Sequence, residues 1–171
     1  MKPFANRYYR LRDARVEVRL VYTGFLLFVV VGMATMAAFQ LHHIGPWPAD
    51  VAAYYRGGER AGQMTFAKTF RELVEVTHFH TFIMGTVYLI VAHLFLATGI
   101  SARVQRLAIL VSFAGLFGDI LSPWLICYVS AGFAYLEVAS WLAEWIGLAT
   151  LMIVPIAEMW FVGVPDELSI G

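Results

Sequence analysis

The sequence predicts an all-α integral membrane protein that folds as a four-helix up-and-down bundle. Of its 171 residues, 60% are hydrophobic and only 14% are charged. The mean hydropathy is +0.71, and the charged residues cluster between apolar runs of about 20 residues, the length needed to cross a bilayer core as a helix. The formal net charge is zero, which excludes the basic surface of a nucleic-acid-binding protein.

The four apolar runs follow one another with short connections after the second and the third. The sequence at Gly99 and again at Gly132 is typical of turns. Short connections favour antiparallel neighbours, and hence an up-and-down bundle. We expect a single membrane domain over residues 1–171, with an outer loop at 41–75 and spans at about 20–40, 76–98, 107–127 and 135–161.

The outer loop is the only long polar segment between spans. We expect Asp50 to cap a short helix that runs through Tyr55, because Asp is a favoured N-cap residue. Gly57 and Gly58 should then end that helix. Apolar residues at helical spacing in 66–75 predict a surface helix or an outward extension of the second span, beginning near Phe66.

Basic residues near the span ends predict the orientation, because cytoplasmic loops carry an excess of Lys and Arg. Most of the 12 Lys and Arg residues fall on one side of a four-span topology. We therefore expect a bacterial inner-membrane protein with both termini in the cytoplasm and residues 41–75 on the periplasmic side. The inner set is Lys2, Arg7, Arg10, Arg12, Arg15, Arg19, Arg103 and Arg106, and the outer set is Arg56, Arg60, Lys68 and Arg71.

Two histidines in the second span, His78 and His93, are the strongest functional signal. Fifteen residues at about 100° each bring the helix to within about 60° of its starting face, so both rings can face one way. An ionisable residue inside a membrane helix is costly and is by default a functional hypothesis. The spacing resembles that of the paired haem-ligand histidines on one helix of the cytochrome b family, and the resemblance, which covers this helix alone, implies haem b.

Bis-histidine haem needs two imidazoles at one depth on facing helices. The third and fourth spans contain no histidine, so His78 is expected to pair with His42 or His43 near the outer face. His93 with Met152 would hold a second haem near the inner face. This predicts a b-type haem electron carrier, or a subunit of a redox complex, that exchanges electrons with a quinol or a periplasmic cytochrome. Such a chain is an electron carrier or subunit rather than a stand-alone enzyme.

A transition-metal site near the outer face is the second hypothesis. Glu75 and His78 form a Glu-x-x-His element, which places two ligands on one helical face as in di-iron bundles. Further nitrogen and oxygen ligands would suit iron, copper or zinc. On an ideal helix His78 and His80 point about 160° apart, so one site would hardly use both. The proposed metal ligands are Glu75, His78, His80, Asp119 and Glu144.

The third hypothesis is an accessory or anchoring subunit without a cofactor of its own. Counting along the third and fourth spans places Asp119 and Glu144 at the same depth, with no Lys or Arg beside them. Two carboxyls in low dielectric share a proton, bind a cation or line a wet cavity. Small residues such as Gly115 and Gly118 allow close helix packing in the lipid bilayer, either within the bundle or against other membrane subunits.

Overall fold

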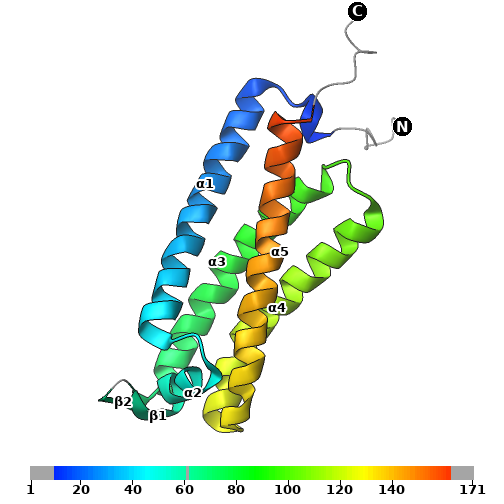
Figure 1. Ribbon diagram of the computed structural model, residues 1–171. Coiled ribbons are helices and arrows are strands. Elements are labelled where there is room, and N and C mark those ends of the chain that lie inside the picture. Colours follow the sequence, from blue (N-terminus) through cyan, green and yellow to red (C-terminus); the bar gives the residue numbers. More distant parts are fainter. Residues whose placement is uncertain (1–9, 61, 163–171) are drawn as a thin grey trace, which may run out of the picture.

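The structure is a computed structural model that describes residues 10–60 and 62–162, and it confirms the predicted four-helix membrane bundle (Figure 1). Four helices within these residues are long and apolar enough to cross a membrane. Consecutive long helices run in opposite directions, as expected for an up-and-down bundle. The elements are the 3₁₀ turn η1 (Leu11–Asp13), α1 (Val16–Phe39), the π-helical turn η2 (Gln40–Ile44), α2 (Pro48–Arg56), β1 (Gly57–Arg60), β2 (Gln63–Ala67), α3 (Phe70–Leu96), α4 (Ala102–Tyr128), the 3₁₀ turn η3 (Ala131–Phe133) and α5 (Ala134–Trp160).

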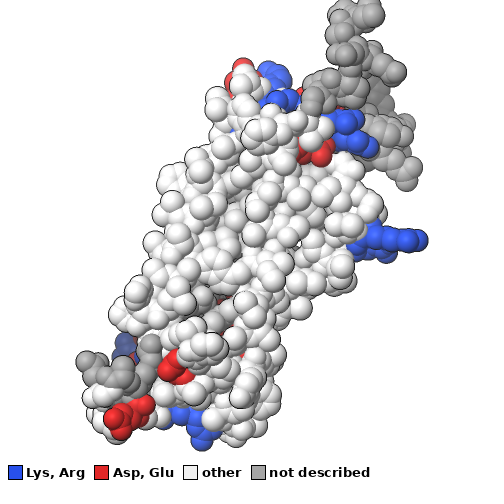
Figure 2. All heavy atoms as spheres, viewed as in Figure 1, with Lys and Arg blue, Asp and Glu red and all other residues white. Residues whose placement is uncertain are grey.

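Most charged side chains on the face shown in Figure 2 gather towards the two ends of the molecule, with an uncharged surface between them apart from one Lys or Arg group at the right-hand edge. This distribution fits a bilayer, where only the helix ends meet water and headgroups. α3 begins at a capping box: Thr69 Oγ1 accepts a hydrogen bond from the Glu72 N–H at 3.3 Å, and the Glu72 carboxylate accepts the Thr69 N–H at 2.7 Å. The expected helix start near Phe66 is therefore wrong, because Phe66 lies in β2.

The outer loop folds as α2 followed by a two-stranded antiparallel hairpin. The expected cap at Asp50 is wrong: the N-cap is Trp47, and Pro48 occupies the first turn, where its missing N–H is no loss. Gly57 ends α2 as predicted, and its φ of +78° is a conformation that favours glycine. Gly57 also pairs with Phe66, so the break leads directly into a strand.

α4 and α5 are packed backbone to backbone through small residues. A Cβ added at Gly115 would lie 2.6 Å from the Glu144 nitrogen. The helices also approach closely one turn away, where a Cβ added at Gly118 would clash with the Ser140 side chain. Such close approach is the usual way in which membrane helices associate without a hydrophobic driving force. It fixes Asp119 on α4 and Glu144 on α5 in one rigid unit.

α1 stands apart from the other long helices. Only 6% of its most apolar stretch is buried, against 39% in α4 and in α5. Tryptophans of α5 hold it at both ends: Trp160 Nε1 donates to Thr23 Oγ1 at 2.9 Å, and Trp145 Nε1 donates to Gln40 Oε1 at 3.3 Å. The middle of α1 is thus free of the close backbone packing that joins α4 and α5.

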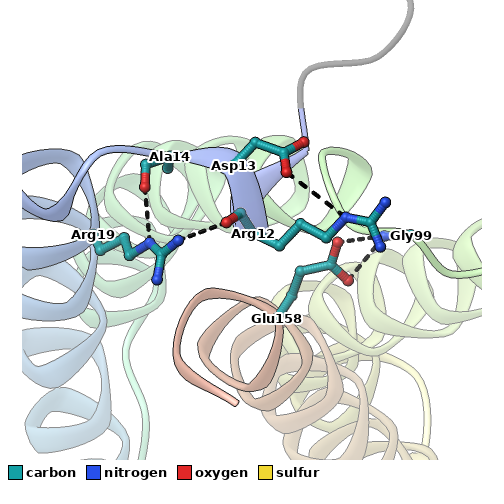
Figure 3. A network of polar contacts seen from close by, with 6 residues as sticks. All are labelled: Arg12, Asp13, Ala14, Arg19, Gly99 and Glu158. Carbon is teal, nitrogen blue, oxygen red and sulfur yellow. Dashed lines mark hydrogen bonds and ion pairs between the residues drawn. The ribbon is translucent and has the colours of Figure 1, made fainter. Parts of the chain in front are cut away.

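Polar contacts at the opposite end from the outer loop fasten η1 and the α3–α4 turn to the bundle (Figure 3). The Glu158 carboxylate accepts the Gly99 N–H at 3.0 and 3.1 Å, which ties the end of α5 to that turn. Arg19 donates to the carbonyls of Arg12 at 2.5 Å and Ala14 at 2.8 Å, closing the chain between η1 and α1. These contacts satisfy backbone groups at helix ends, which would otherwise be left unpaired.

Candidate functional site

Two cavities meet inside the bundle. The first, here called the lateral groove, lies between α1 and α3 and has a volume of about 550 Å³. The second, here called the outer cavity, is lined by residues of α2 and of the four long helices and has a volume of about 440 Å³. His80 and Asp119 line both, so the two cavities share one polar wall. The lining residues used below are Phe28, Gly32, His80, Ile83, Asp119, Glu144 and Trp145 for the lateral groove, and Tyr55, Glu75, His80, Asp119, Glu137 and Trp141 for the outer cavity.

Three polar side chains lie at one depth where the cavities meet. His80 on α3, Asp119 on α4 and Glu144 on α5 are each about ten residues from the outer-loop end of their helix, about 15 Å along the helix axis. The equal depth predicted for Asp119 and Glu144 therefore holds in the structure, and both line the lateral groove. Polar groups at this depth lie well within the apolar band of the bundle.

Asp119 is the centre of the site. Its side chain is buried, and its Oδ1 accepts a hydrogen bond from Trp141 Nε1 at 2.9 Å. His80 lies near enough to interact with it electrostatically. His80 Nδ1 contacts the Val76 carbonyl at 3.2 Å, which suits a protonated Nδ1 and leaves Nε2 as the atom available to a ligand. The site thus combines a carboxyl with an imidazole that has one uncommitted nitrogen.

A second buried carboxyl, Glu137, links this site to the outer loop. Glu137 is only 1% exposed, and its two oxygens accept hydrogen bonds from Ser122 Oγ at 2.5 Å and Tyr55 Oη at 3.3 Å. Burial, and then the neighbouring Glu137, raises the pKa of Tyr55 well above its ordinary value of 10.0, so this phenol keeps its proton at neutral pH. Asp119 interacts electrostatically with Glu137 as well as with Glu144.

Tyr88 of α3 completes the polar chain on the far side of Glu144. The residue is fully buried, its ring packs edge-on against Phe113, and its hydroxyl has no hydrogen-bond partner within the described structure. The Tyr88 side chain interacts with the Glu144 carboxyl. A buried hydroxyl without a partner is costly, so a hydrogen-bonding group delivered to this place would be stabilised.

The predicted haem ligands lie elsewhere. His42, His43, His78 and His93 are exposed on the outside of the bundle, where His43 stacks on a neighbouring phenylalanine and His78 contacts two. Met152 is buried in the apolar core, whereas His93, its predicted partner, is exposed. A haem bound by the exposed imidazoles would lie on the lipid-facing surface or between this chain and another polypeptide.

The predicted metal ligands are divided between two places. Glu75 is exposed and forms an ion pair with Arg71 at 2.8 Å on its own helix, although it also lines the outer cavity. His78 faces outwards, whereas His80 lies at the site with Asp119 and Glu144, as expected for histidines two residues apart on a helix. Among the residues that the structure describes, no three His, Cys, Asp or Glu side chains converge as metal ligands.

Several site residues were missed as candidates from the sequence. Glu137 sits seven residues before Glu144, and this spacing places both on one face of α5 and could have identified it. Tyr55 and Trp141 look like ordinary interfacial aromatics. Tyr88 has no sequence signal beyond a hydroxyl in the middle of an apolar run.

The fold and the site define a polytopic α-helical membrane protein with an intramembrane cluster of carboxyls and one imidazole. The chain belongs to the Aq_1264_TM family, described as a transmembrane helical domain, whose sequence pattern matches residues 45–166. The matched region begins after α1 and contains every polar residue of the site. No curated protein and no solved structure matches the chain.

Proposed function

We propose that this chain handles protons inside the bilayer as a subunit of a membrane redox system. The observation that carries the proposal is a series of protonatable groups, from the outer loop to the middle of the bundle, each of which interacts electrostatically with the next. The series runs from Tyr55 through Glu137, Asp119 and Glu144 to Tyr88, and is here called the acid relay.

The surroundings of the acid relay favour proton exchange over a static ion pair. No Lys or Arg occurs between residues 107 and 162, so α4 beyond Arg106 and all of α5 carry no cation that would neutralise the carboxyls. Carboxyls that are buried without a cation are stabilised in the membrane when they hold or share protons. Ser122 and Trp141 donate to them and fix their positions without supplying charge.

The redox part of the proposal rests on the histidines. The exposed imidazoles near the outer end of the bundle, His42, His43 and His78, are the expected ligands or neighbours of an electron-transfer centre shared with another subunit. Protons are commonly moved beside such centres because electron transfer changes the charge that the low-dielectric interior must hold. A reduced-minus-oxidised absorption spectrum of the purified chain tests this part: a b-haem signal that is lost in His78→Ala supports it, and a colourless protein removes haem from the chain.

Infrared spectroscopy of the reconstituted full-length protein tests the acid relay. Protonated carboxyls absorb apart from carboxylates, so a pH titration should show bands that disappear singly in Asp119→Asn, Glu137→Gln and Glu144→Gln. Glu59→Gln is the matched control, because Glu59 is exposed in the outer hairpin. Carboxylates at all three positions at neutral pH would contradict the proposal.

A further inference from the structure

The lateral groove opens onto the lipid-facing side of the bundle, on the uncharged surface between the charged ends. Its mouth includes Phe28 of α1, which is 80% exposed, and Ile83 of α3, which is 58% exposed. Its volume of about 550 Å³ lies within the range of about 300–1,000 Å³ that is usual for small-molecule sites. Because α1 makes few close contacts along its middle, a ligand can reach this space from within the bilayer.

The inner wall of the groove is polar, although the mouth is apolar. His80, Asp119 and Glu144 lie there at one depth, and the hydroxyl of the fully buried Tyr88 interacts with Glu144. An apolar site with a few convergent polar groups is the usual form of a ligand pocket.

The depth of these groups decides the chemistry of the ligand. The charged headgroup of a phospholipid stays at the membrane interface, whereas this wall lies about 15 Å along the helix axis from the outer-loop ends of α4 and α5. An anionic headgroup would in addition meet two carboxyls. The ligand must therefore carry a small, uncharged head that makes hydrogen bonds, together with an apolar tail. A quinol meets this description, since its ring hydroxyls can donate to the carboxyls and to His80 Nε2. The oxidised quinone meets it as well, because its ring carbonyls can accept hydrogen bonds from protonated carboxyls. In both forms the prenyl tail remains in lipid.

We propose that the lateral groove binds an isoprenoid quinone or quinol, with the ring against His80, Asp119 and Glu144 and the tail leaving between α1 and α3. This inference rests on the proposed function, because the groups that would contact the ring are members or neighbours of the acid relay. The acid relay would then connect the ring to the outer loop. The quinone bound in the groove would be the proton-carrying substrate of the redox system.

Fluorescence quenching by a short-tailed quinone, decylubiquinone, tests the groove in the full-length protein reconstituted in lipid nanodiscs. Trp145 lines the groove, so bound quinone should quench its emission to saturation. Glu144→Leu and His80→Leu each remove one polar group that faces the ring and should weaken binding about tenfold or more. His93→Leu is the matched control, because His93 is exposed on the same helix, and it should leave the affinity unchanged.

A second pair of variants tests whether quinone occupies the groove by filling it with a larger side chain, without changing the acidic residues. A Cβ at Gly32 meets nothing within 4 Å, so Gly32→Leu should fold normally and fill the groove. Gly24 of the same helix is equally open but does not line the groove, and Gly24→Leu is the control. The inference predicts loss of saturable quenching in Gly32→Leu alone.

Quenching that does not saturate, or equal binding in Gly32→Leu and Gly24→Leu, would overturn the inference. So would relief of the quenching by added phosphatidylglycerol, because the groove would then be a phospholipid site. The infrared bands of the acid relay do not depend on quinone. Failure of quinone binding with those bands intact therefore refutes the inference and leaves the proposed function standing.

Discussion

Replacing Gly115 by alanine should destabilise the bundle although alanine is the better helix former. The added Cβ would lie 2.6 Å from the Glu144 nitrogen, 3.0 Å from the Ala143 carbonyl carbon and 3.0 Å from the Glu144 Cα. All three are backbone atoms, which cannot rotate away. Since ordinary contacts of this kind begin near 3.4 Å, α5 must move away from α4 by roughly 0.5–1 Å, and overpacking of this kind costs about 1–3 kcal/mol.

The controls are Gly85→Ala and Gly24→Ala, where the new Cβ meets nothing within 4 Å. Without a clash, the gain in helix propensity should stabilise each by up to about 1 kcal/mol. The free energy of unfolding is measured by titrating the protein in mixed micelles with a denaturing detergent. If Gly115→Ala were as stable as Gly85→Ala, the close packing of α4 and α5 and the positioning of Glu144 that follows from it would be refuted.

Three further predictions concern polar contacts. Burial raises the pKa of Tyr55 above 10.0, so above about pH 10 the unfolded chain loses this proton before the folded chain does. Stability should therefore fall as pH rises beyond 10, and less steeply in Tyr55→Phe; equal slopes in alkaline unfolding experiments would contradict this. Glu158→Ala leaves the Gly99 N–H without its acceptor and should cost about 1–3 kcal/mol in the same detergent titration, whereas Glu17→Ala, at an exposed position, should cost little. Trp141→Phe and Asp119→Asn should show a coupling energy of at least about 0.5 kcal/mol in a double-mutant cycle, and additive effects would argue against their hydrogen bond.

Hydropathy predicted the spans because lipid imposes one strong requirement, an apolar run of sufficient length. The ends were less predictable. The start of α3 depends on the capping box at Thr69, and the segment around Phe66 satisfies its backbone groups in a hairpin instead of a helix. Apolar spacing alone did not separate these two outcomes.

Helix rotation was the main limit on predicting the site. In a soluble helix the apolar stripe marks the buried face, but α3 is apolar on both its lipid face and its bundle face. Counting residues along each helix therefore gave the depth of a side chain and correctly placed Asp119 level with Glu144. The direction in which each histidine points, towards lipid or into the bundle, could not be derived from the sequence. The structure turns His80 inwards and His78 and His93 outwards, and the four histidines predicted as haem ligands are surface residues.

The most direct test of the central claim is the rate at which the buried carboxyls exchange their protons with water. Reconstituted protein is moved from H₂O into D₂O, and the shift of each carboxyl band is followed with time. The acid relay predicts that the Asp119 and Glu144 bands exchange rapidly in the native protein and much more slowly in Glu137→Gln, because Glu137 joins them to Tyr55 and the outer loop. Equal exchange rates in the two proteins would show that protons reach Asp119 and Glu144 by a route that does not include Glu137, and would contradict the acid relay.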